Sequence, residues 1–214
     1  MSNQPMVSMI NNEIYETYTT CKGKFHRVDG PAFTCINLTK NKKIETWYHD
    51  DKIHRIDGPA EIKKKNDIVS ETWYHDGKIH RIDGPAYVTK HQNNVIHEAW
   101  YHDGKIHRID GPAYVTKHQN NVILEEWWYT NGINNRYNGP AMTQRSSDGT
   151  VINEFYYFDG IRFEKSMYMK TMKILKNFIH RLKDRYRKTL VSTLRDTDFF
   201  YEKFLCNEVA KYII

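Results

Sequence analysis

Short segments with alternating apolar and polar positions recur along most of the chain and predict β-strands. Ala86–Lys90 is one such segment, and Val95–His102 is a second that would return beside it. His91–Asn94 lies between them and predicts a turn, because asparagine tolerates the positive φ values that turns require. Asp76-Gly77 predicts another turn, since this pair suits a two-residue hairpin loop. The pattern therefore predicts a series of antiparallel hairpins.

The hairpins belong to a tandem repeat. The tetrapeptide Asp/Asn-Gly-Pro-Ala occurs five times, with steps of 28, 26, 27 and 28 residues between its glycines. Trp73–Ile96 is identical to Trp100–Ile123, which indicates a duplication. Each proline lacks an N–H group and would break the strand ladder at a corner. The residues of this repeat frame are Gly30, Pro31, Gly58, Pro59, Gly84, Pro85, Gly111, Pro112, Gly139 and Pro140.

The end copies are degenerate, as expected of a capped linear array. The first copy keeps Gly23–Arg27 but has Thr19 at the position aligned with tryptophan. Phe155–Gly160 begins a sixth copy that never reaches the tetrapeptide. An additional residue near Trp127-Trp128 predicts a β-bulge.

These features predict the fold class and the domain organisation. We expect a mainly β, elongated single-layer array of five full hairpin copies and a partial sixth over residues 13–163. A polar segment at 1–12 precedes the array, and a cap of one or two α-helices follows at 164–214. With about 10 Å per hairpin, the array would be roughly 50 Å long.

After Ser166 the apolar period changes from 2 to about 3.6, which predicts an amphipathic helix. Its apolar stripe comprises Met172, Leu175, Ile179, Leu182, Tyr186 and Leu190. Its basic face is a candidate surface for an anionic partner and comprises Lys173, Lys176, Arg181, Lys183, Arg185, Arg187 and Lys188. A second helix is predicted after Asp196 or Asp198, with apolar residues Phe200, Phe204, Val209 and Ile213.

The basic character of the chain is concentrated in this helical segment. Lys165 to Arg195 carries a net charge of +9 against +6 for the whole chain, so the remainder carries −3. We expect the helix to cap the last edge of the sheet, because an uncovered edge strand invites pairing with other chains. The same pattern suits a partner protein, an anionic membrane or nucleic acid. Of these partners, nucleic acid is disfavoured.

Composition narrows the class of protein. Apolar residues make up 39% of the chain and aromatic residues 14%, which suits a thin, half-exposed sheet. Cys21, Cys35 and Cys206 form no CxxC pair, which argues against a disulfide framework and favours a reducing compartment. The first residues do not resemble a signal peptide, and no segment is apolar enough to span a membrane. We therefore expect an intracellular protein that is not secreted and has no transmembrane segment.

Strand alternation predicts a candidate interaction face. In the returning strand, Glu98 and Trp100 lie on one face, while His97 and Ala99 lie on the other. We expect the glutamate-bearing face to be the more solvated one, which would leave its tryptophans partly exposed. This row comprises Trp47, Trp73, Trp100 and Trp128.

Histidine and aspartate recur densely enough to suggest a ladder of metal sites. His75, His80 and Asp83 are the donors of one copy. Each repeat occupies about 10 Å of the sheet and places only one or two of these donors there, whereas a zinc ion needs ligands that converge at about 2.0–2.3 Å. The degenerate copy has Thr130, Asn135 and Asn138 at these three positions and keeps the frame. We therefore expect structural hydrogen bonds from these side chains, with no tightly bound metal and no cofactor.

The repeats contain no candidate catalytic residues. The recurring His-Arg-Ile-Asp sequence matches part of a kinase catalytic loop, but a kinase has one such loop together with a glycine-rich loop and a DFG motif. No serine or cysteine recurs beside the histidines, as a hydrolytic triad would need. Because an enzyme needs one preorganised constellation, near-identical copies argue against catalysis and against a small-molecule substrate.

Tyr74–His80, written as aromatic-x-Asp-Gly-Lys-x-His, resembles the MORN repeat. From Gly23 to Gly160 the chain is similar to the DGPA-bearing, MORN-like repeat proteins of giant DNA viruses of amoebae. Where MORN has a glycine after the histidine, this chain has Arg81, and the next glycine is Gly84. The resemblance implies a single-layer hairpin array that scaffolds or tethers, in host cytoplasm or a virion. We therefore expect a non-enzymatic scaffold for protein–protein interaction, with a peripheral membrane tether as the alternative.

Overall fold

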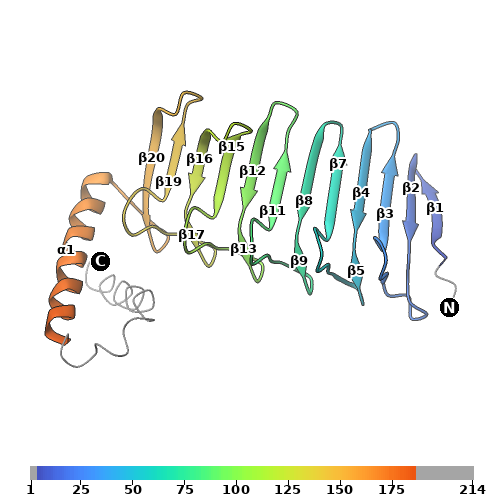
Figure 1. Ribbon diagram of the computed structural model, residues 1–214, viewed down its shortest axis with the longest axis horizontal. Helices are drawn as coiled ribbons and strands as arrows, with labels where there is room; N and C mark the ends of the chain where they lie inside the picture. The colour runs from blue at the N-terminus through green and yellow to red at the C-terminus, as the bar shows by residue number, and fades with distance from the viewer. Residues whose placement is uncertain (1–3, 187–214) are drawn as a thin grey trace.

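A computed structural model describes residues 4–186, which form an open antiparallel sheet that ends in a helix (Figure 1). Hairpins follow one another across the sheet in chain order, and each pairs with the next. The N-terminal hairpin lies at one end of the sheet and the helix at the other (Figure 1). The expected mainly β hairpin array with a C-terminal helical cap is confirmed.

Thirteen strands of the described residues make up the main sheet. In spatial order they are β1 (Met6–Ile10), β2 (Glu13–Thr17), β3 (Phe33–Asn37), β4 (Lys42–Thr46), β7 (Glu61–Lys65), β8 (Ile68–Thr72), β11 (Tyr87–Lys90), β12 (Val95–Ala99), β15 (Tyr114–His118), β16 (Ile123–Trp127), β19 (Met142–Arg145), β20 (Val151–Phe158) and β21 (Ile161–Phe163). Short hairpins pair β5 (Tyr48–His49) with β6 (Lys52–Ile53), β9 (Tyr74–His75) with β10 (Lys78–Ile79), β13 (Tyr101–His102) with β14 (Lys105–Ile106), and β17 (Tyr129–Thr130) with β18 (Ile133–Asn134). Helix α1 spans Lys165–Tyr186.

Each central repeat therefore contains a long hairpin and a short one. β11 pairs with β12 from Tyr87↔Ala99 onward, and β13 then pairs with β14. Trp100 separates β12 from β13, and its N–H donates to the carbonyl of Ala113 at 2.8 Å. The prediction of one continuous returning strand over Val95–His102 is therefore wrong, because the strand is interrupted at Trp100. The backbone N–H of Trp100 donates to the corner of the next repeat.

The turns and the bulge are close to where the sequence predicts them. Asp76 and Gly77 have φ values of 49° and 81°, as their hairpin turn requires. In the hairpin of β15 and β16, Thr116 pairs with Glu125, whereas Lys117 pairs with Ile123. The additional residue is therefore Leu124, three positions before the predicted site.

The N-terminal boundary differs from the prediction. The sequence predicts a polar segment outside the array over residues 1–12, but β1 pairs with β2, and β2 pairs with β3. Asn11 and Asn12 form the turn with φ values of 50° and 65°, which asparagine adopts more readily than most residues. An Asn-Asn turn between two short alternating segments is the signal that would have identified this hairpin.

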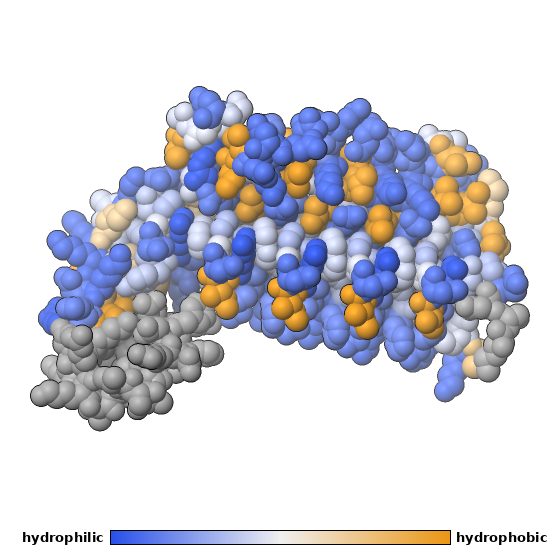
Figure 2. All heavy atoms as spheres, in the orientation of Figure 1, coloured by the Kyte–Doolittle hydropathy of each residue, from blue (hydrophilic) through white to orange (hydrophobic). Residues whose placement is uncertain are grey.

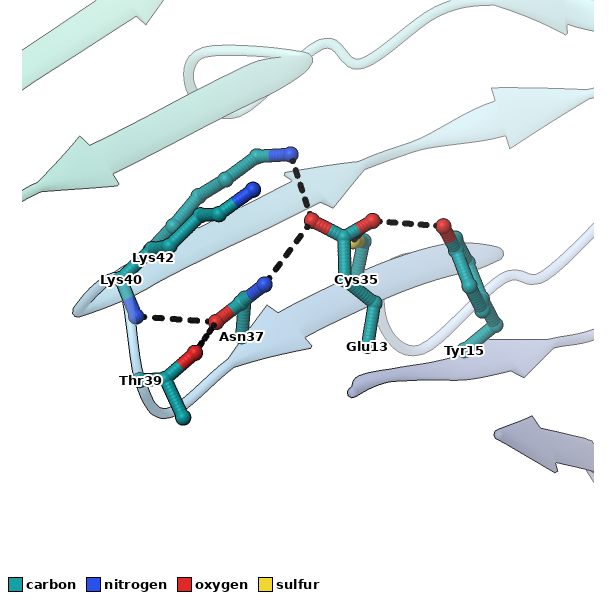
Figure 3. Close-up of polar contacts among 7 residues, drawn as sticks. All are labelled: Glu13, Tyr15, Cys35, Asn37, Thr39, Lys40 and Lys42. Carbon is teal, nitrogen blue, oxygen red and sulfur yellow. Dashed lines mark hydrogen bonds and ion pairs between the residues drawn. The ribbon is translucent and has the colours of Figure 1, made fainter. Parts of the chain in front are cut away.

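Glu13 joins the N-terminal hairpin to the first full repeat (Figure 3). Its carboxylate accepts hydrogen bonds from Tyr15 Oη at 2.6 Å, Lys42 Nζ at 3.1 Å and Asn37 Nδ2 at 3.3 Å. These hydrogen bonds lower the pKa of Glu13 to about 2, and the bond to Glu13 raises the pKa of Tyr15 to about 12. The carboxylate thus connects β2 with β3 and β4.

The apolar core of the described residues lies where α1 covers the end of the sheet. Tyr168, Met172, Leu175 and Ile179 are buried there against Tyr156 and Phe158 of β20. Tyr168 Oη donates to the carbonyl of Arg136 at 2.5 Å and accepts from the N–H of Gly139 at 3.3 Å. The predicted stripe is confirmed at Met172, Leu175 and Ile179. Leu182, Tyr186, Leu190 and the second predicted helix lie outside the residues whose side chains are described.

Substituting aspartate for Ile179 tests this cap. Ile179 is 6% exposed, so burial of a charge at this position should lower the free energy of unfolding by about 2–5 kcal/mol. Ile174→Asp is the matched control, because Ile174 is 59% exposed and its replacement should change stability by less than about 0.5 kcal/mol. Urea unfolding followed by circular dichroism measures both, and equal small effects would show that α1 does not pack on the sheet.

Candidate functional site

At four of the five corners an arginine contacts three different groups: an aromatic ring, the corner acid and the carbonyl of the corner proline. Arg81 lies over the ring of Trp73, with Cζ 4.2 Å from the centroid. Its Nε donates to Asp83 Oδ1 at 2.8 Å, and its Nη1 donates to the carbonyl of Pro85 at 3.3 Å. A planar guanidinium can stack and donate at once, which a lysine cannot. The same stacking, at 3.9 to 4.3 Å, occurs in Arg27–Tyr18, Arg55–Trp47, Arg108–Trp100 and Arg136–Trp128.

The first copy uses Tyr18 in place of tryptophan, which corrects the alignment with Thr19. The N–H of Tyr18 donates to the carbonyl of Ala32 at 2.8 Å, the bond that later tryptophans make to their corner alanines. Tyr18 precedes Arg27 by one residue more than the tryptophans precede their arginines. Alignment by spacing alone therefore selects the wrong residue.

The glycine of the tetrapeptide leaves room for the arginine. A Cβ on Gly84 would lie 3.2 Å from Arg81 Cζ, and one on Gly30 would lie 2.8 Å from Arg27 Cζ. Both distances are shorter than an ordinary contact of 3.4–4 Å. Close packing against the guanidinium, rather than a positive φ, therefore explains these glycines.

The arginine also sets the ionisation of the corner acid. The hydrogen bond from Arg81 lowers the pKa of Asp83, and Asp29, Asp57 and Asp110 are affected in the same way. The fifth corner has an asparagine at this position. There the buried Nε of Arg136 has no hydrogen-bond partner within the described part of the chain, and burial lowers the pKa of Arg136.

The predicted tryptophan face is half-buried, because each ring carries an arginine. A strongly exposed large apolar side chain instead follows each of the first four corner arginines: Val28, Ile56, Ile82 and Ile109 are 87%, 90%, 91% and 65% exposed. We call them the corner row. Figure 2 shows apolar groups at regular intervals along one side of the array, as such a row would produce. An isoleucine in a strand-rich repeat is ordinarily assigned to the core, so only its position between arginine and aspartate could have identified it.

Histidine rings form a ladder along the short hairpins. Successive centroids are 4.8 to 6.2 Å apart through His26, His49, His54, His75, His80, His102 and His107. His54 Nδ1 accepts a hydrogen bond at 3.1 Å from the N–H of Asp76 in the next repeat. His26, His80 and His107 accept equivalent bonds. The structural hydrogen-bonding role predicted for histidine is thus confirmed for these four, which we call the inner histidines.

Three contacts between adjacent repeats, which we call the histidine seams, gather two histidines and an aspartate. They are His26, His49 and Asp50; His54, His75 and Asp76; and His80, His102 and Asp103. One donor atom from each residue lies within 4.8 Å of the others in its seam. The sequence-based estimate predicts too few metal donors at one place because it considers the histidines and aspartate of a single repeat. Each seam instead combines donors from two adjacent repeats. Asp83, which the sequence suggests as a metal ligand, instead accepts a hydrogen bond from Arg81.

The candidate basic face is described only in part. Lys173, Lys176 and Arg181 are exposed on α1, and Lys176 Nζ lies 5.7 Å from the ring centroid of Tyr137. The side chains of Lys183, Arg185, Arg187 and Lys188 lie outside the described residues. Within the described range, no helix combines the length and the apolar character needed to cross a bilayer.

No protein-family model matches this sequence, and no curated protein matches it either. The corner row, the corner arginines and the histidine seams therefore have to be interpreted from their own geometry.

Replacing Arg81 by lysine tests the corner. Lysine keeps the charge but loses the planar stack on Trp73 and the fork that reaches Asp83 and Pro85, so the free energy of unfolding should fall by about 1–2 kcal/mol. Lys78→Gln, an exposed change in the same repeat, should stay within about 0.5 kcal/mol. Urea unfolding followed by tryptophan fluorescence compares them, and an unchanged Arg81→Lys variant would contradict this account of the corner.

Proposed function

We propose that the chain is a non-enzymatic repeat scaffold that binds a protein partner along the corner row. The observation that carries the proposal is the exposure of a large apolar side chain at the same position of four successive repeats. A row of exposed apolar groups bordered by polar residues is typical of an interaction surface. The groups beside it recur from copy to copy, so none forms the single constellation that catalysis requires.

The fifth corner indicates what kind of partner would fit. Tyr137 occupies the row position there and packs partly buried against the apolar core beneath α1. Tyr168 of α1 bonds to the backbone of Arg136 and Gly139 on either side of it. An amphipathic helix thus covers the one corner of the five whose row residue is not strongly exposed. We infer that the partner is also an amphipathic helix.

The spacing of the row suits a helix that lies along the array. A helix advances about 10.5 Å in seven residues, and two strands occupy about 10 Å of a sheet. Apolar residues seven apart would therefore meet one corner each. The buried stripe of α1 has this spacing, from Tyr168 to Leu175 and from Met172 to Ile179.

The acid beside each row residue is paired with its corner arginine and still presents an exposed carboxylate, which suits a basic partner. Asp29, Asp57, Asp83 and Asp110 each follow a row residue and have side chains 73% to 80% exposed. Complementary charges steer association and fix the register of an interface. A helix with lysine or arginine beside its apolar stripe, as α1 has, would meet both the apolar and the acidic groups.

A second candidate function is peripheral attachment to an anionic membrane. Met167, Ile174 and Phe178 on the outer side of α1 are 54%, 59% and 39% exposed. Lys170 and Lys173 lie among them and are also exposed. A basic helix with an exposed apolar stripe can lie in a membrane interface. Flotation with phosphatidylserine vesicles that is abolished by Ile174→Asp would favour this function over the first.

The scaffold function is tested with a fluorescent peptide of residues 165–186, titrated into the full-length protein and followed by anisotropy. Binding should weaken by about 100-fold in the Ile56→Asp/Ile82→Asp variant, because each isoleucine contributes roughly ten-fold when buried. Val151→Asp/Ile152→Asp is the matched control, with residues 48% and 61% exposed away from the corners, and should bind as the unaltered chain does. Failure of the peptide to bind, or equal binding by both variants, would contradict the proposal.

A further inference from the structure

We propose that the three histidine seams bind divalent transition-metal ions, one ion per seam, with zinc as the ion that tests the site. Each seam supplies two imidazoles and one carboxylate from two adjacent repeats. Two nitrogen donors and one oxygen donor favour zinc, nickel or copper over magnesium and calcium. A bound ion would therefore link neighbouring repeats, a role separate from the docking of a helix at the corner row.

The second seam shows how the donors converge. His54 Nδ1 lies 3.2 Å from Asp76 Oδ1, and His75 Nδ1 lies 3.6 Å from Asp76 Oδ2. The rings of His54 and His75 are tilted, with centroids 4.9 Å apart. Tetrahedral zinc at about 2.0–2.2 Å from each ligand separates its donors by roughly 3.3–3.6 Å. One donor atom from each residue lies within 4.8 Å of the others, so the side chains must approach by about 1–1.5 Å to close the site. The side chains of His75 and Asp76 are 63% and 60% exposed and have room to move.

Zinc would compete with one structural hydrogen bond. His54 Nδ1 accepts from the N–H of Asp76, so its Nε2 carries the proton of the neutral ring. An ion on Nδ1 displaces that N–H, which water can solvate because Asp76 is exposed. Nε2 keeps its proton, and water would complete the four ligands of the zinc. No covalent bond of the protein changes, and binding is reversible.

The remaining contacts between repeats separate the structural role from the proposed one. His107 accepts a hydrogen bond from the N–H of Asn131, as the inner histidines of the seams do from their aspartates. Here Thr130 and Asn131 replace the histidine and aspartate of the three seams. At the next contact, Asn135 accepts from the N–H of Asp159 at 3.1 Å without any imidazole. The backbone bond therefore needs neither the carboxylate nor the second histidine of the seam. We call these second histidines, His49, His75 and His102, the outer histidines. An outer histidine and an aspartate occur together with an inner histidine in each of the three seams.

The third seam repeats the geometry of the second. His80 Nδ1 lies 3.3 Å from Asp103 Oδ1, and His102 Nδ1 lies 3.4 Å from Asp103 Oδ2. In the first seam, His26 Nδ1 lies 3.2 Å from Asp50 Oδ1, although the surrounding sequence differs and Asp51 replaces the turn glycine. The three sites would form a row at about 10 Å intervals along the array.

Zinc titration of the full-length protein tests the proposal. The chain is first treated with a chelator and dialysed, then equilibrated with zinc chloride at pH 7.5, and bound metal is measured by mass spectrometry. We expect three ions per chain, one for each seam. The melting temperature should rise with zinc, because a ligand that binds the folded state alone stabilises it.

Substitution of the outer histidines identifies the sites. Each of His49→Gln, His75→Gln and His102→Gln should remove one ion, and the triple variant should bind none. His118→Gln is the control, because His118 lies outside the seams, and it should retain all three ions. If the triple variant fails to fold, Asp50→Asn/Asp76→Asn/Asp103→Asn replaces it, since asparagine tolerates the positive φ of these positions. Absence of zinc from the unaltered chain, or undiminished binding by a folded triple variant, would overturn the proposal.

Discussion

One arginine at each corner holds the repeat together. The Arg81 guanidinium meets the aromatic ring that ends one long hairpin, the acid of the corner and the carbonyl that leads into the next hairpin. A Cβ at Gly84 would lie 3.2 Å from the Cζ of this guanidinium, so a side chain there would require the arginine to shift. The N–H of Arg81 also donates to the carbonyl of Tyr101 in the next repeat, so the residue that closes one unit aligns its neighbour. The other features of the array depend on this arrangement.

A chain of such corners leaves the outer surface free for function. Because each corner arginine covers its aromatic ring, the row of aromatic side chains contributes to stability. The apolar residue that follows the arginine, such as Ile82, is exposed to solvent. The inner histidines likewise hold the neighbouring backbone, while the outer histidines beside them remain exposed. The proposed docking surface therefore uses side chains that the frame does not need, whereas each proposed metal site combines two exposed donors with one inner histidine of the frame. The number of repeats sets how many such groups are presented.

The sequence predicts the parts of this structure that depend on local chemistry. The repeat period, the Asp-Gly turn at Asp76 and the stripe through Leu175 follow from turn preferences and helix geometry, and the structure confirms each. Contacts between repeats could not be predicted in this way. Whether Ile82 is buried, or whether His54 meets Asp76, depends on the rotation from one hairpin to the next, which no single repeat encodes. The stacking of Arg81 on Trp73 joins residues eight positions apart and has no periodic signature.

The central claim is that the molecule is an open array in which each repeat is stabilised by its own corner and its two neighbours. Deletion of Trp73–Ala99 tests it most directly, because both Thr72 and Ala99 are followed by an equivalent tryptophan and end equivalent strands. The shortened chain should fold, with the circular dichroism of a β-array and a modestly lower melting temperature, since it loses one unit and one interface. An insoluble or unfolded product would show that distant repeats are required and would contradict the open array.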